Sequence, residues 1–182
     1  MFRGIHLLSI DAKGRIKIPV RHQSQIAKAC SGQMVLSIHP DDPCLLLYPL
    51  SDWQNLERKI AELPSLNVHS KRLSRKLIGH ANECELDKIG RILIPLSHRN
   101  HANLNKKVIF SGQGHGFEIW DENIWAEQIE KLERLSTQVE TPQEIQKLLD
   151  YMTATDPRQR YSDAVEAVDA ISACLRGSAV SS

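Results

Sequence analysis

The sequence contains no apolar run long enough to span a bilayer, and its N-terminus lacks the apolar core of a secretory signal. Its four cysteines are scattered and form no C-x-x-C pair, so reduced, buried thiols are expected. Only nine aromatic residues occur, which is few for a surface that stacks single-stranded bases. We therefore expect a cytoplasmic protein that has no membrane partner.

An excess of charge of one sign is also lacking. The 23 Lys and Arg residues face 22 Asp and Glu residues, which gives a net charge of +1. This balance argues against a broad basic coat for nucleic acid, although local basic patches fit within it. The glycines of residues 112–116 join two expected strands, which is the wrong context for a dinucleotide site. No nucleophile or base accompanies the aspartates considered below, so we expect no enzyme, no cofactor and no small-molecule substrate.

What the sequence does contain is a repeated stretch. The segment 11–19 (DAKGRIKIP) recurs without gaps as the segment 87–95 (DKIGRILIP), so that each matched residue lies 76 positions after its counterpart. The aspartate, glycine, arginine, two isoleucines and proline keep their places, and His22 and His98 follow in the same register. Such a match predicts one small structural unit that is used twice.

Each copy is typical of a strand, a tight turn and a second strand. An aspartate can bond to the backbone two residues further on, and glycine accepts a positive φ, so Asp-x-x-Gly predicts a hairpin connection. An arginine, Arg15 or Arg91, stands at the exit of each turn, where a guanidinium can reach a phosphate or a guanine edge. The alternative, which we weight equally, is that each arginine only pairs with the aspartate of its own turn.

The rest of the chain predicts an α+β fold. Strands are expected over 5–10, 15–18, 33–39, 44–48, 108–111 and 117–120. Helices are expected over 20–30, over 52–63 and over 71–78, and two more are expected shortly after Pro95 and after Asp121. The expected caps at the starts of the second and third of these helices are Ser51 and Ser70. One repeat alone has roughly sixty residues and a thin core. The two repeats are therefore expected to bury their strands against each other.

Several separate motifs carry a resemblance to a known family. Beside the two turns, these are MFRG at 1–4, PCLLLYP at 43–49, LIGHA at 77–81 and FEIWD at 117–121. In this order and spacing they resemble the MraZ family, bacterial transcription regulators of the AbrB/SpoVT class, over about residues 1–137. The resemblance implies two AbrB-like split β-hairpin units in one closed, interleaved β-barrel. It also implies a nucleoid-associated homo-oligomeric ring that binds double-stranded DNA at short, G-rich direct repeats, in a promoter ahead of the division and cell-wall genes.

The resemblance implies a set of contact residues as well. Arg15 and Arg91 would read bases or phosphates, further phosphate contacts would be Lys13, Lys17 and Lys88, and additional candidates are Arg3 and Arg21. The residues that only shape the turns would be Asp11, Gly14, Asp87 and Gly90. The copies differ in charge, because Lys13, Lys17 and Arg21 become Ile89, Leu93 and Ser97, whereas the second copy gains Arg99. We therefore predict that the first turn carries more of the phosphate affinity.

By sequence, the chain divides into a first repeat (1–66), a basic connector helix (67–80), a second repeat (81–137) and a helical appendage (138–182) that departs from the family pattern. The basic connector is either a phosphate-tracking face or a solvated surface, and the solvated surface is favoured. His98 and His101 share a helix face without a clear third ligand, so no metal is expected. A single-stranded RNA module and a protein-interaction scaffold remain as rival functions.

Overall fold

The computed structural model describes residues 1–63 and 67–136. The strands are β1 (Phe2–Ser9), β2 (Arg15–Lys17), β3 (Gln33–Ile38), β4 (Leu45–Pro49), β5 (Asn82–Glu85), β6 (Arg91–Leu93), β7 (Lys107–Gly114) and β8 (Phe117–Asp121). The helices are α1 (Val20–Cys30), α2 (Leu50–Ala61), α3 (Val68–Leu77), α4 (Leu96–His101) and α5 (Glu122–Ser136). The chain divides into two units, Met1–Gln128 and Ile129–Ser182. The first unit is described below, and the helices predicted beyond residue 137 lie outside the described residues.

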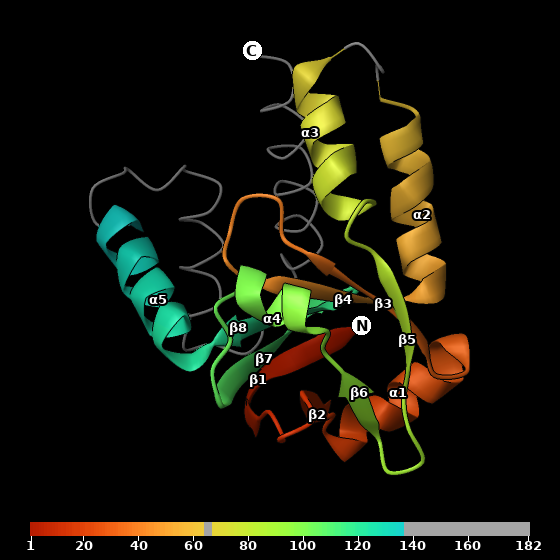
Figure 1. The fold of residues 1–182 in the computed structure, drawn as a ribbon, viewed down its shortest axis with the longest axis vertical. Coiled ribbons are helices and arrows are strands. Elements are labelled where there is room, and N and C mark those ends of the chain that lie inside the picture. Colours follow the sequence, from red (N-terminus) through yellow and green to blue (C-terminus); the bar gives the residue numbers. More distant parts are fainter. Residues whose placement is uncertain (64–66, 137–182) are drawn as a thin grey trace, which may run out of the picture. The chain divides into compact units, whose positions relative to one another are not determined.

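The first unit is an α+β structure whose strands join the two repeats. Six antiparallel strands form one sheet in the order β1-β7-β8-β4-β3-β5, and β2 pairs with β6 in a separate sheet. The first repeat's β1 pairs with the second repeat's β7, and the second repeat's β5 pairs with the first repeat's β3. Neither repeat could therefore make this sheet alone. Figure 1 shows β2 and β6 on the far side of the sheet from α2 and α3.

Two expectations about the strands need correction. The strands that flank each predicted hairpin do not pair with each other, because β1 pairs with β7 whereas β2 pairs with β6. The expected closed barrel is not found among the described residues, where β1 and β5 are the edges of the larger sheet. Both differences follow from the shortness of β2 and β6. Each has three residues and ends two residues before a proline, Pro19 or Pro95, that begins a helix.

Both repeats contribute to the main core. The isoleucines that follow the first turn, Ile16 and Ile18, are fully buried beside their counterparts Ile92 and Ile94. A second apolar cluster lies between the sheet and the helices α2 and α3, where Trp53 is 2% exposed and packs with Val35, Ile60 and Leu77. Loss of so large a buried side chain typically costs about 3–5 kcal/mol. The second cluster explains why α2 and α3 stand side by side above the sheet (Figure 1).

The helix starts differ from the predicted ones in two places. Helix α2 begins at Leu50, directly after strand β4, instead of after Ser51. Helix α3 begins at Val68, and its cap is Asn67, whose side chain accepts a hydrogen bond from the backbone N–H of His69. The predicted cap at Asp121 is confirmed, since its Oδ1 accepts from the backbone N–H of Asn123 at 3.0 Å.

No helix of the described part is long and apolar enough to cross a membrane. Within the same residues, Cys30, Cys44 and Cys84 are free thiols, and Cys44 is fully buried. Burial raises the pKa of the Cys84 thiol to about 12, so that this thiol stays protonated at neutral pH.

Candidate nucleic-acid interface

Each repeated motif folds into a turn that its aspartate organises. In the first turn, Oδ1 of Asp11 accepts hydrogen bonds from the backbone N–H groups of Lys13 at 2.9 Å and Arg15 at 3.0 Å. The backbone N–H of Gly14 donates to the Asp11 carbonyl at 2.9 Å, and Gly14 has a φ of 80°. A residue with a side chain rarely adopts this φ, so the turn requires glycine at this position.

The second turn has the same geometry. Oδ1 of Asp87 accepts from the backbone N–H groups of Ile89 at 3.0 Å and Arg91 at 2.9 Å, and Gly90 has a φ of 77°. The hydrogen bond from the Arg91 backbone N–H is the main reason that the pKa of Asp87 is lowered, and that of Arg15 lowers the pKa of Asp11 in the same way. Both carboxylates therefore remain charged at neutral pH.

The two arginines pair with these carboxylates, but to different extents. Nε of Arg15 lies 3.0 Å from Oδ2 of Asp11, and neither Nη of Arg15 has a hydrogen-bond partner among the described residues. In contrast, Arg91 contacts Asp87 through Nε and Nη2, each at 2.8 Å, and its Nη1 lies 3.6 Å from Oδ2 of Asp11. Each arginine thus pairs with the aspartate of its own turn, which was the alternative to a contact with nucleic acid. This pairing leaves the Nη donors of Arg15 free.

The pairing of β2 with β6 brings the two turns together. Arg15 lies opposite Leu93, and Lys17 lies opposite Arg91. The residues between them, Ile16 and Ile92, are buried in the core, so the other four side chains share the outer face of this strand pair. Three of those four are cations. In addition, Lys13 and Lys88 are exposed in the turns themselves.

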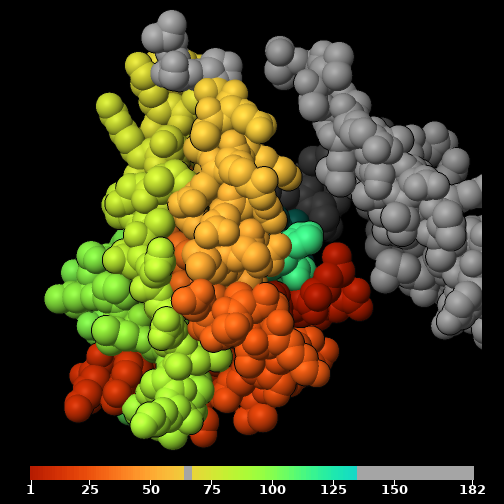
Figure 2. All heavy atoms as spheres, turned by 90° about the vertical axis from the view of Figure 1, so that its right-hand side faces the viewer, coloured from red at the N-terminus to blue at the C-terminus, as the bar shows by residue number. Residues whose placement is uncertain are grey.

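Each turn is also fastened to the other repeat. The backbone N–H of Ile94 donates to the Gly14 carbonyl at 2.8 Å, and that of Ile18 donates to the Gly90 carbonyl at 2.9 Å. The side chain of Arg99, from α4, lies against Gly14, and that of Gln23, from α1, lies against Gly90. Figures 1 and 2 both show α1 beside the second turn.

This arrangement corrects the sequence-based view of Arg99. The sequence credits Arg99 to the second copy, whereas its guanidinium lies at the first turn. Sequence reasoning missed it as a member of the first site because the exchange of elements between repeats is a tertiary property. The register of the repeat matches Arg99 with Gln23, 76 residues earlier, and by itself assigns Arg99 to the second copy.

Two candidate residues belong neither to the turns nor to the strand pair β2–β6. Arg3 is exposed near the start of β1, with Nη2 3.7 Å from the sulfur of Met1. The whole of strand β1, roughly 3.3 Å per residue, separates Arg3 from the first turn. Arg21 is exposed on α1, two residues before Gln23, and no hydrogen bond or ion pair of its side chain is found in the described part of the chain.

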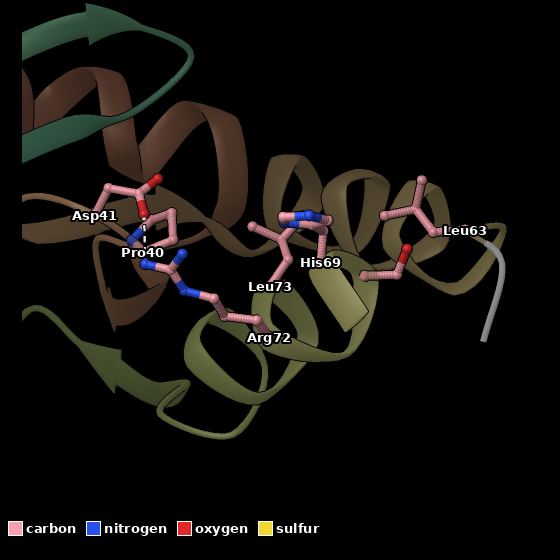
Figure 3. A pocket seen from close by; sticks show the side chains of 7 residues that line it. Pro40, Asp41, Leu63, His69, Arg72 and Leu73 are labelled. Atoms are coloured by element: carbon pink, nitrogen blue, oxygen red, sulfur yellow. Dashed lines mark hydrogen bonds and ion pairs between the residues drawn. The ribbon is translucent and has the colours of Figure 1, made fainter. Parts of the chain in front are cut away.

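The basic face of α3 is partly structural. Arg72 forms an ion pair with Asp41 at 2.9 Å, and Nζ of Lys76 donates to the carbonyl of Pro40. Figure 3 shows the Arg72–Asp41 pair at the edge of a pocket of about 350 Å³. These two cations thus hold the loop between β3 and β4, which favours the solvated, structural interpretation for them. The other two cations of α3 are Lys71 and Arg75.

The two histidines that follow the turns in the same register bond within the fold. Nε2 of His98 lies 2.8 Å from the backbone carbonyl of His80. Its counterpart His22 is buried and contacts His6 and Gln25. Among the residues that the structure describes, no three His, Cys, Asp or Glu side chains are grouped for a metal ion.

Comparison with known proteins identifies the source of the twinned turns. Residues 1–76 and 77–147 each match the family described as "MraZ protein, putative antitoxin-like". The chain belongs to the MraZ family. The second match extends ten residues past the boundary at 137 that the sequence motifs indicate. Each matched segment contains one of the two turns.

Relatives of this MraZ family member carry a functional name. The chain is 52% identical over 125 residues to "Transcriptional regulator MraZ" of Methylococcus capsulatus, covering 69% of this chain and 82% of the relative. It is 49% identical over 125 residues to the protein of that name from Alkalilimnicola ehrlichii, covering 69% and 83%. It is 46% identical over 133 residues to that of Nitrosococcus oceani, covering 73% and 89%. That name is not one of an enzyme class.

Proposed function

We propose that this chain is a transcriptional regulator that binds double-stranded DNA in a sequence-specific manner. The observation that carries the proposal is the pairing of β2 with β6, which sets two identical Asp-x-x-Gly-Arg turns side by side with their cations on one outer face. The names of the relatives support regulation of transcription. We propose that the protein acts in the cytoplasm, in association with the nucleoid.

The roles of the side chains follow from their geometry. Arg15 is held at Nε by Asp11, which leaves its Nη donors for a guanine edge or a phosphate. Arg91, whose nitrogens all face carboxylates, must exchange some of these contacts for DNA and so binds more weakly. Lys13, Lys17 and Lys88 contact phosphates, and Arg3 and Arg21 make outer contacts. The turn residues Asp11, Gly14, Asp87 and Gly90 position the cations without touching DNA.

One pair of turns is small for a specific interface, which typically buries about 1,000 Å² or more of protein surface. We propose that a homo-oligomeric ring presents several pairs, so that weak contacts at successive direct repeats add by multivalency. The exposed apolar side chains of the edge strand β1, Ile5 at 59% and Leu7 at 54%, are available for subunit contacts. Within each chain, the two repeats would combine in the interleaved arrangement of the AbrB/SpoVT class.

The proposed target is a promoter with short, G-rich direct repeats ahead of the division and cell-wall genes. The proposed regulator consists of two repeats, at 1–66 and 81–137, which are linked by the connector at 67–80. Residues 138–182 form an appendage to which we assign no role in binding.

An electrophoretic shift tests the proposal against its rivals. The full chain should shift a duplex carrying G-rich direct repeats at lower concentration than a scrambled duplex or the matching RNA. Equal shifts of both duplexes would remove sequence specificity, and preference for the RNA would favour the single-stranded RNA module. No shift of any nucleic acid, from a folded oligomer, would favour the protein scaffold. Native mass measurement of the same sample gives the subunit number.

A further inference from the structure

The two turns are covered by side chains at matched positions of the repeat. Nε2 of Gln23 donates to the carbonyl of Ile18 at 2.6 Å while its amide lies against Gly90. Nε of Arg99 donates to the carbonyl of Ile94 at 3.2 Å while its guanidinium lies against Gly14. The two side chains therefore do the same structural work for the backbone. They differ in charge, because one turn is covered by a neutral amide and the other by a cation.

The position of Arg99 leaves most of its donors free. Its Cζ and Nη2 lie 3.0 Å, and its Nε 3.1 Å, from the point where a Cβ on Gly14 would stand. Three atoms at nearly equal distance mean that the guanidinium lies flat over the glycine. Nε is used by Ile94, and within 1–63 and 67–136 neither Nη has a hydrogen-bond partner. The fixed plane thus offers two Nη groups beside the turn that ends at Arg15.

We propose that Arg99 is a phosphate contact of the first turn, supplied by the second repeat; this rests on the proposed DNA-binding function. A phosphate that approaches Arg15 and Lys13 also meets the Nη donors of Arg99, because all three side chains belong to or cover one turn. A phosphate is favoured over a base, since the group is tied at Nε and does not extend from the surface. Arg99 thereby adds one further positive charge to the first turn, which is the more cationic of the two.

The repeat itself supplies the matched variants for a test. Affinity of the full chain for a duplex with G-rich direct repeats is measured over a series of salt concentrations. For each subunit that contacts the duplex, Arg99→Gln should weaken binding about tenfold, as expected for one charge-assisted hydrogen bond, and lower the salt slope by about 1. Arg99→Lys should keep the slope, and Gln23→Arg should raise it by about 1 per contacting subunit. Thermal unfolding of Arg99→Gln should match the parent, because glutamine makes the equivalent bond at the other turn.

The inference is overturned if Arg99→Gln leaves affinity and slope unchanged, or if Arg99→Lys loses as much as Arg99→Gln. Arg15→Ala separates this failure from that of the proposed function. If Arg15→Ala abolishes the shift while Arg99→Gln does not weaken it, the DNA-binding proposal stands and the role of Arg99 falls. If the parent chain does not prefer the repeat duplex over the scrambled one, both fall together.

Discussion

The first and second turns share one backbone but present different chemistry to solvent. Both have an aspartate that accepts two backbone hydrogen bonds, a glycine at positive φ and an arginine at the exit. They differ in the residues that the backbone does not need, since the lysines of the first turn and strand correspond to Ile89 and Leu93 in the second. The comparison separates residues required for the fold from residues free to set affinity.

The largest expected difference concerns the two arginines. Arg15→Ala should lower DNA affinity by about 1–3 kcal/mol, as for loss of one good bidentate contact, and more than Arg91→Ala does. The reason is that Arg15 keeps its Nη donors, whereas every nitrogen of Arg91 faces a carboxylate. Affinity measured at several salt concentrations checks this.

Arg75→Ala on α3 is the matched control, because Arg75 is an exposed arginine away from the turns. It should leave affinity for the repeat duplex unchanged, and a loss would revive the phosphate-tracking role of that helix. Equal losses from Arg15→Ala and Arg91→Ala would contradict the asymmetry between the turns.

The sequence predicts the local part of this site and misses its assembly. The turns could be predicted because Asp and Gly carry the turn chemistry within a few residues. The pairing of β2 with β6 could not, since a three-residue strand such as Arg15–Lys17 holds no information about its partner. For the same reason, the sequence alone assigns Arg99 to the second turn, whereas its guanidinium lies at the first. The predicted hairpins are wrong because β1 and β5 pair with the longer strands β7 and β3 of the other repeat, which leaves β2 and β6 to pair with each other.

Exchanging the charges of the two turns sharpens the comparison. Replacing Lys13 by isoleucine and Lys17 by leucine gives the first copy the apolar residues of the second. For each subunit that contacts the duplex, this double variant should weaken binding several-fold at moderate salt and lower the salt slope by about 2, one for each phosphate contact. The reverse double variant, Ile89→Lys with Leu93→Lys, should raise the slope. An unchanged slope in both would mean that these lysines make no phosphate contact.

Substitutions of the two turn glycines should differ in how far they lower the stability of the protein. A side chain in the left-handed region costs about 1–2 kcal/mol, so Gly14→Ala and Gly90→Ala should both lower the free energy of unfolding in urea. Gly90→Ala should cost more, since the added methyl displaces the Gln23 amide from its bond to Ile18. Gly32→Ala is the control, because Gly32 has a φ of 89° with nothing within 4 Å of the added methyl. If Gly32→Ala lowers the free energy of unfolding more than Gly14→Ala or Gly90→Ala does, the contacts of the added methyl group at the turns cost no stability.

The smallest expected effect is on the pH dependence of stability, and it should be the same at both turns. The pKa values of Asp11 and Asp87 are lowered from the ordinary 3.8, chiefly by backbone hydrogen bonds. A carboxyl with a lowered pKa in the folded state stabilises above its ordinary pKa, and this contribution is lost as pH falls through the folded value. Unfolding measured between pH 5 and about 2 should therefore be less pH-dependent in Asp11→Asn and in Asp87→Asn, to a similar and small degree, because solvent screens both sites. Unequal slopes would mean that the turns differ in their backbone geometry as well as in charge, and the separation of fold from affinity would fail there.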